Sequence, residues 1–361
     1  MYEFFFKTGC VEMGIKMTRI IKYDVLRVFA SFSIVLLHVS ASYWSVVDVQ
    51  SKEFAVMTVY NSLTRFAVPV FFMLSGLFLI SPDRGNKTLV KRVLKLVLLF
   101  YVWSAFYAFQ GVAVDALTGN FAPETLNDAV ERFIFGHVHM WFLQMLCGFY
   151  ILTPVAKQIC AKKESVHYYL LLWAVFRYLL PCLTNAFHLY TLQARIDSLG
   201  MDILVGNFGY FLLGYYLNNI DIRKEVRRII YIMGIGAVCL TALLTIWDSR
   251  RSGTYVESWF SPASLNILMM SAAIFIFFKY AALFEQMKKP ALWIKLSGYT
   301  FFVYMFHMFI IEKLNLIGIT TVSFPAVLSI PAITLFTFGV SLFAAFVVSH
   351  IPFVRKIVML H

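Results

Sequence analysis

The sequence predicts an all-α integral membrane protein, a bundle of about ten transmembrane helices with both termini in the cytoplasm. Two observations on composition and one on charge distribution support this fold class. Of the 361 residues, 60% are hydrophobic and only 14% are charged, whereas soluble proteins carry about 25% charged residues. Aromatic residues make up 17% of the chain. A soluble fold that exposed so much apolar surface would aggregate, so the bilayer is the solvent that fits.

The apolar residues are grouped into long runs. A helix that crosses the hydrocarbon core needs about 20 apolar residues, because each residue rises about 1.5 Å. Ten segments meet this requirement. They are residues 23–44, 57–80, 93–114, 140–156, 166–183, 203–220, 229–247, 260–284, 292–312 and 325–349.

The segments between these runs alternate between rich and poor in Lys and Arg. The rich set, which includes both ends of the chain, holds 21 of these residues, and the poor set holds 6. Positively charged loops stay in the cytoplasm, so both termini are predicted there. The net charge of +12 is spread over short loops rather than gathered in a patch, which favours a membrane surface over a nucleic acid as its partner.

The chain is predicted to hold one domain, a transmembrane domain over residues 23–350, between cytoplasmic segments 1–22 and 351–361. The first residues lack a signal-peptide pattern, and Met13 or Met17 could be the start. Residues 126–135 have helical apolar spacing, so they form either an amphipathic helix on the outer membrane surface or a short helix packed within its loop. Histidine and cysteine show no ligand spacing, so no metal site is expected.

Two polar residues stand out on the first span. Arg27 and His38 are eleven residues apart, which returns to within about 20° of the same helix face and climbs about 16 Å. Charge at membrane depth costs about 2.5 kcal/mol or more, so it needs a structural or a functional reason. One face of this helix therefore carries a cation near the cytoplasm and an imidazole toward the outside.

The second span contains the string from Arg65 to Gly76, with Pro69 inside it. Proline within a helix removes a hydrogen bond and bends the chain. The pair Ser75-Gly76 allows a neighbouring backbone to approach closely. We expect a kinked helix with an intramembrane arginine, which by itself is as consistent with packing as with function.

Two further histidines are expected at a depth similar to that of His38. His139 opens the fourth span, two residues before Trp141, and His307 lies in the outer half of the ninth span. Tyr304 is three residues before His307, so the two side chains share a face and could bond one another. Each histidine alone is more often structural, but three at one depth predict a polar cavity that opens outward.

Together these strings resemble the acyltransferase-3 family of integral membrane acyltransferases, and most closely its surface-polysaccharide O-acetyltransferases of the enterobacterial common antigen type. The resemblance covers about residues 20–350, with its features in the expected order. They are Tyr23 to Arg27 followed by His38, Arg65 to Gly76, His139 to Leu143, Phe208 to Tyr216, and Ser297 to His307.

The resemblance implies a reaction and a location. Such enzymes transfer an acyl group, usually acetyl, from cytoplasmic acyl-CoA to a hydroxyl of a cell-surface glycan or a lipid-linked sugar. The donor substrate would be acetyl-CoA, and the protein would lie in the bacterial cytoplasmic (inner) membrane. The chain lacks a glycine-rich phosphate loop and a nucleophile elbow, so a serine-type acyl-enzyme is not visible.

The resemblance also implies roles for residues of this chain. Arg27 would meet the CoA phosphates, His38 would act as the general base or as a relay for the acyl group, and Arg65 would hold the donor or stabilise an oxyanion. The residues expected to bind substrate are Asp24, Ser75, His139, Trp141, Tyr304 and His307. Trp141 could stack on a sugar face.

Two other functions are compatible with these residues. Intramembrane charges and a kinked helix also suit a transporter or flippase for a small polar or glycan substrate, and a structural or sensory role remains a third reading. The sequence does not identify the acceptor, the acyl length or the oligomeric state. It also leaves open whether transfer is direct or passes through a covalent intermediate.

Overall fold

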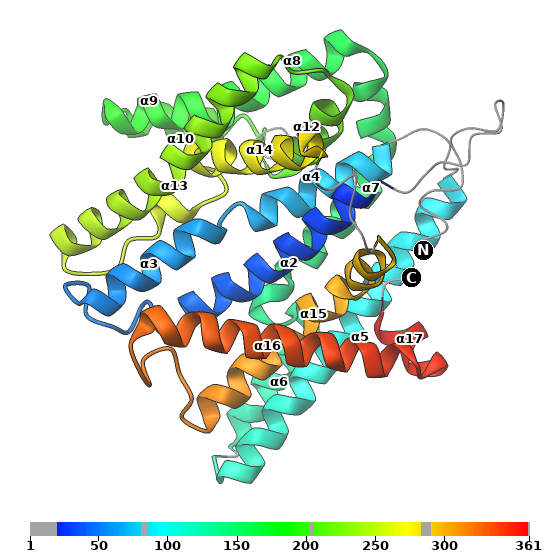
Figure 1. The fold of residues 1–361 in the computed structure, drawn as a ribbon, viewed down its shortest axis with the longest axis vertical. Coiled ribbons are helices and arrows are strands. Elements are labelled where there is room, and N and C mark those ends of the chain that lie inside the picture. The colour runs from blue at the N-terminus through cyan, green and yellow to red at the C-terminus, as the bar shows by residue number, and fades with distance from the viewer. Residues whose placement is uncertain (1–19, 81–85, 121, 202–205, 283–289, 360–361) are drawn as a thin grey trace.

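A computed structural model describes residues 20–80, 86–120, 122–201, 206–282 and 290–359, and the regular elements within these ranges are all helices (Figure 1). The first half comprises α2 (Ile21–Ala41), α3 (Lys52–Thr64), α4 (Ala67–Ile80), α5 (Asn86–Thr118), α6 (Pro123–Phe135), α7 (Trp141–Ala161), α8 (Lys163–Ala174), α9 (Leu180–Ala186) and α10 (Tyr190–Asp197). The second half comprises α12 (Phe208–Asn219), α13 (Lys224–Ser252), α14 (Leu265–Tyr280), α15 (Pro290–Leu316), α16 (Ala326–Ser349) and α17 (Pro352–Val358).

The predicted fold class is confirmed: the protein is a polytopic helical membrane protein. Within the described ranges, nine helical segments are long and apolar enough to cross a membrane. Nine of the ten predicted spans correspond to them. The remaining one, residues 203–220, is α12, which has 12 residues. Residues 202–205 lie outside the described part of the chain.

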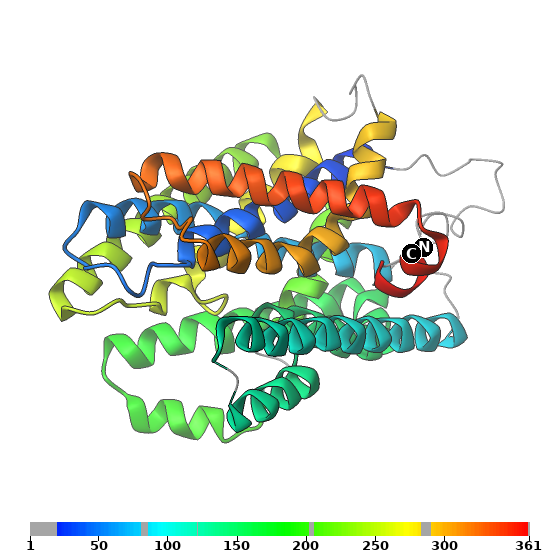
Figure 2. The same ribbon diagram turned by 90° about the horizontal axis from the view of Figure 1, so that it is seen from below.

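Hydrogen bonds show which helix ends lie at the same end of the bundle. The hydroxyl of Tyr23 donates to the side chain of Asn218, so α12 ends beside the start of α2. Arg250, near the end of α13, donates to the carbonyl of Val49 in the loop after α2, at the opposite end of the bundle (3.3 Å). Figures 1 and 2 show the start of α2 and α17 toward the same end. The prediction that the end with the start of α2 and α17 faces the cytoplasm rests on the distribution of Lys and Arg in the sequence.

The predicted kink in the second span is a break between two helices. α3 ends at Thr64, α4 begins at Ala67, and Arg65 lies in the turn between them. Pro69 falls in the first turn of α4, where a missing backbone N–H leaves no intrahelical bond unmade. The amide of Val70 donates to the carbonyl of Phe66 (3.0 Å), which starts the hydrogen bonding of α4.

Glycines bring α4 and α12 into contact through their backbones, as the Ser75-Gly76 pair predicts. A Cβ atom on Gly76 would lie 1.7 Å from the carbonyl oxygen of Phe211, and one on Gly214 would lie 2.0 Å from the carbonyl oxygen of Met73. No side chain fits at either position. This contact fixes α12 against the helix that follows Arg65.

Residues 126–135 form most of the helix α6, beside α5 (Figure 2). The apolar side chains of Leu126 and Val130 are exposed, whereas the ring of Phe133 lies beside that of Tyr101 on α5, with centroids 5.6 Å apart. The two alternatives open from the sequence, an amphipathic helix on the outer membrane surface and a short helix packed within its loop, both stay predictions.

Candidate active site

Three histidines from distant parts of the sequence meet at one place in the bundle. His38 comes from the last turns of α2, His307 from α15, and His139 from a short 3-10 turn, Val138–Met140, that precedes α7. The ring centroids of His38 and His307 are 5.1 Å apart, those of His139 and His307 are 5.3 Å apart, and those of His38 and His139 are 6.5 Å apart. We call these three residues the histidine cluster. The sequence placed them at one depth, and the structure places them in contact.

The hydrogen bonds of His307 define its protonation. Its Nδ1 lies 2.7 Å from the carbonyl oxygen of Tyr304 and 3.1 Å from that of Val303. A carbonyl only accepts, so Nδ1 carries the proton and Nε2 of the neutral ring carries a lone pair. Nε2 is buried and has no hydrogen-bond partner among the described residues. Such a nitrogen can receive a hydrogen bond from a substrate.

Tyr304 and His307 share a helix face, but their side chains do not bond each other. Their ring centroids are 6.1 Å apart, and the Tyr304 hydroxyl, at the far end of its ring, instead donates to the backbone carbonyl of His139. The Tyr304 side chain is long enough to extend beyond α15, so its hydroxyl reaches the 3-10 turn before α7. Tyr304 therefore ties the 3-10 turn before α7 to α15.

Sequence reasoning missed three residues that extend the histidine cluster. Nδ1 of His137 lies 2.9 Å from Nδ1 of His139, and Nε2 of His137 lies 2.8 Å from Oε1 of Glu312 on α15. The ring of Tyr107 stacks on His137 with centroids 4.4 Å apart. The sequence does show two histidines separated by one residue, His137 and His139, and an acidic residue at the end of a predicted span. It does not show that these two segments meet in the fold.

Arg65 lies close to the histidine cluster. Its Nε donates to Oδ1 of Asn61 (2.6 Å), and its guanidinium carbon lies 4.0 Å from the centroid of the Phe260 ring. It interacts electrostatically with His38 and with Glu257. The break between α3 and α4 thus positions a cation between His38 and the segment that carries Glu257 and Phe260.

The structure separates Arg27 and Asp24 from the histidine cluster. Both residues lie on the first half of α2, and at 1.5 Å per residue Arg27 is about 16 Å along the helix from His38. The guanidinium carbon of Arg27 lies 5.3 Å from the centroid of the Phe78 ring on α4, and Asp24 is buried. Arg27 and His38 both contact other helices of the bundle, at two different levels.

Ser75 and Trp141 lie outside the histidine cluster, on α4 and α7. The hydroxyl of Ser75 donates to the carbonyl of Phe71 in its own helix (2.8 Å), so its proton is already used. Trp141 begins α7 directly after the 3-10 turn, its ring centroid is 6.4 Å from that of Phe72, and it is 39% exposed. That exposure leaves the indole open to a partner from outside the chain.

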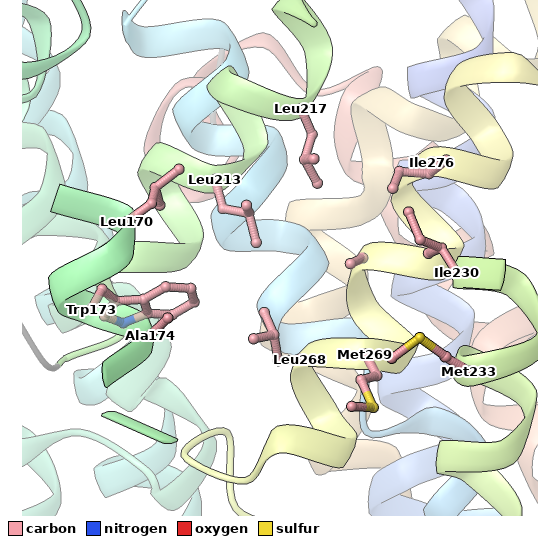
Figure 3. Close-up of a pocket in the computed structure, with 11 residues that line it drawn as sticks. Leu170, Trp173, Ala174, Leu213, Leu217, Ile230, Met233, Leu268, Met269 and Ile276 are labelled. Carbon is pink, nitrogen blue, oxygen red and sulfur yellow. The ribbon is translucent and has the colours of Figure 1, made fainter. Parts of the chain in front are cut away.

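A separate apolar pocket of about 300 Å³ lies between α8, α12, α13 and α14 (Figure 3). Its lining is aliphatic or aromatic, with Trp173 and Leu170 on one side and Ile230 and Met233 on the other. Along α14 it extends from Leu268 to Ile276, about 12 Å at the helical rise. The residues that line it carry no acidic, basic or nucleophilic side chain, and the lining suits a hydrocarbon chain.

A scan against protein-family models matched the acyltransferase domain of the acyltransferase-3 family over residues 20–349. A search of curated proteins and a search of solved structures returned no match. The matched region contains all the residues of the histidine cluster together with Arg27 and Arg65. Because the match extends over nearly the whole chain, this protein belongs to the acyltransferase-3 family of membrane acyltransferases.

Proposed function

We propose that this protein is a membrane O-acyltransferase that moves an acetyl group from cytoplasmic acetyl-CoA to a hydroxyl of a cell-surface glycan or lipid-linked sugar. The observation that carries the proposal is the convergence of His38, His139 and His307 within a matched acyltransferase domain. Imidazole is the side chain that most often moves the proton of a hydroxyl in enzymes. The membrane in question is the cytoplasmic membrane of a bacterium, with acetyl-CoA on the side where α2 begins.

The proposed roles place CoA binding near the start of α2 and the chemistry at the acyl carbon near its end. Arg27 binds the CoA phosphates, which a guanidinium recognises through paired hydrogen bonds, and the buried carboxylate of Asp24 lies one turn before it. His38 acts at the acyl carbon, either as the base for the acceptor hydroxyl or as a relay for the acyl group. Arg65 stabilises negative charge on the carbonyl oxygen.

The acceptor is proposed to approach through the other end of the bundle. His139 and His307 offer nitrogen atoms to its hydroxyl groups, and Tyr304 holds the turn that carries His139. Trp141 is exposed and can stack on a sugar face. Ser75 contributes less to substrate binding, because its hydroxyl already donates to a backbone carbonyl of its own helix.

The apolar pocket between α8 and α13 supports an acceptor that is attached to a lipid. A water-soluble sugar would gain little from contact with this apolar lining, whereas a hydrocarbon chain would bury apolar surface there. Gly214 of α12 faces α4 while Leu213 and Leu217 face the pocket. A tail held there would lie against the helix that is fixed to α4.

The experiment that tests the function uses membranes that contain the protein, with radiolabelled acetyl-CoA and membranes from the native host deleted for the gene as the source of acceptor. We expect label in the glycan or lipid-linked sugar fraction, and none with membranes that lack the protein. Binding of CoA is measured in parallel by calorimetry. Absence of CoA binding together with measurable substrate flux would favour a transporter instead.

Replacing Arg27 by glutamine should raise the KM for acetyl-CoA at least about tenfold while kcat changes little, because a lost charge-assisted bond costs about 1.5–3 kcal/mol of binding. Lys91→Gln, an exposed residue on α5, should leave KM unchanged and serves as the control for removing one positive charge. Equal KM values for the wild type and Arg27→Gln would refute the proposed phosphate contact.

A further inference from the structure

A chain of hydrogen bonds connects the histidine cluster with the surface of the protein. It runs from Oε1 of Glu312 to Nε2 of His137 (2.8 Å) and from Nδ1 of His137 to Nδ1 of His139 (2.9 Å). Exposure falls along this path, from 31% of the Glu312 side chain to 11% of the His137 side chain and 1% of His139. The path therefore leads from an accessible carboxylate to a buried imidazole.

The identity of these atoms assigns the protons along the path. A carboxylate only accepts hydrogen bonds, so Nε2 of His137 carries a proton. Nδ1 of a neutral His137 then carries a lone pair, and the proton in the 2.9 Å contact belongs to Nδ1 of His139. The second nitrogen of His139, Nε2, is left with a lone pair. It is buried and has no hydrogen-bond partner among the described residues.

Two buried nitrogens without partners lie on neighbouring rings of the histidine cluster. The ring centroids of His139 and His307 are 5.3 Å apart, and that of His38 lies 6.5 Å from that of His139. Like His139, His307 has a lone pair on a buried Nε2 that has no hydrogen-bond partner among the described residues. A group with an O–H to donate is what these two acceptors lack.

We propose that Glu312, His137 and His139 form a proton relay that deprotonates the acceptor hydroxyl, which rests on the acyltransferase function proposed above. As the hydroxyl oxygen bonds to the acyl carbon and the bond from that carbon to its leaving atom breaks, the hydroxyl proton goes to Nε2 of His139. The proton on Nδ1 of His139 passes to Nδ1 of His137, which becomes an imidazolium paired with the Glu312 carboxylate. In direct transfer the leaving atom is the CoA sulfur, which departs as a thiolate and takes a proton from water.

The roles in this relay differ. His139 contacts the reacting hydroxyl and is the catalytic base, whereas His137 and Glu312 act through it as positioning residues. The amide of Gln110, in the orientation that satisfies both of its groups, donates to Oε2 of Glu312 (3.3 Å) and accepts from Lys313 (2.7 Å). With the base at His139, His38 is left with the second of its two proposed roles, the handling of the acyl group.

The test compares Glu312→Gln and Glu312→Asp with the wild type in the labelled acetyl-CoA assay. Glutamine keeps the shape and an accepting oxygen but has no charge to stabilise the imidazolium. We expect Glu312→Gln to lower kcat roughly tenfold to hundredfold with the KM for acetyl-CoA unchanged, and Glu312→Asp to recover most of that loss. His139→Gly should lose activity in the same way and regain part of it when imidazole is added to the assay.

Matched controls come from the exposed surface. Glu131→Gln on α6 and His188→Asn in the loop after α9 change exposed residues of the same types. His188 has a positive φ of 54°, which asparagine tolerates. Both controls should keep the wild-type kcat and KM.

The outcomes separate the relay from the function on which it rests. Wild-type kcat in Glu312→Gln would overturn the relay, and so would a joint change of kcat and KM that aspartate does not restore, because that pattern indicates a structural role. Lack of rescue of His139→Gly by imidazole, in a variant that still binds acetyl-CoA, would also overturn it. No labelling by the wild-type protein would instead refute the acyltransferase proposal itself.

Discussion

Replacing His38 by alanine is expected to lower acetyl transfer by about 1000-fold, the largest effect of any single change in this protein. General acid–base groups contribute roughly 100-fold to 10,000-fold to a rate, and a side chain that carries the acyl group contributes at least as much. The ring of His38 lies 5.1 Å from that of His307 and 6.5 Å from that of His139, centroid to centroid. The rate of label transfer from acetyl-CoA to the acceptor fraction measures the loss.

Binding of acetyl-CoA should survive in His38→Ala, because Arg27 lies about 16 Å away along α2. Calorimetry with CoA therefore shows that the variant is folded. The control is His167→Ala, which removes an exposed histidine on α8. If His38→Ala kept more than a tenth of the wild-type rate, His38 would have no direct part in the reaction.

The largest expected effect on stability comes from Gly76→Ala. The new methyl carbon would lie 1.7 Å from the carbonyl oxygen of Phe211, and a backbone atom cannot move aside as a flexible side chain can. We expect the free energy of unfolding to fall by about 3 kcal/mol or more, toward the upper range for overpacking. Thermal unfolding in detergent, followed by size-exclusion chromatography, measures the change.

Gly236→Ala on α13 provides the matched control. An added Cβ atom there meets nothing within 4 Å, so the substitution should raise stability by roughly 0.5–1 kcal/mol through the better helix propensity of alanine. Equal melting temperatures for Gly76→Ala and Gly236→Ala would show that the close approach of α4 and α12 does not contribute to stability.

The sequence was sufficient for the features that depend on local pattern. Apolar length predicted nine spans that the structure contains, Pro69 predicted the break beside Arg65, and Ser75-Gly76 predicted a close backbone contact. Each follows from the chain's own periodicity or from a residue with a fixed conformational effect. Of the predicted span 203–220, the helix α12 covers Phe208–Asn219, and residues 203–205 lie outside the described part of the chain.

The features that depend on contact between distant segments could not be predicted. His137 and Glu312 are 175 positions apart in the printed sequence, and neither is unusual in its own segment. The hydroxyl of Tyr304 bonds the carbonyl of His139 rather than His307 because α15 packs beside the turn before α7, which no helical spacing reveals. Helical spacing in the sequence shows on which face of a helix a residue lies, but it does not show which residue of another segment packs against that face.

The backbone contact between α4 and α12 has a mechanical consequence. Two helices that touch through glycine and carbonyl atoms cannot slide past each other, because even a small shift would drive an oxygen into a Cα atom. They therefore move as one rigid body. Any opening that admits or releases a substrate must come from displacement of the helices around this pair, while the α12 side of the apolar pocket keeps its position relative to α4 and the turn at Arg65.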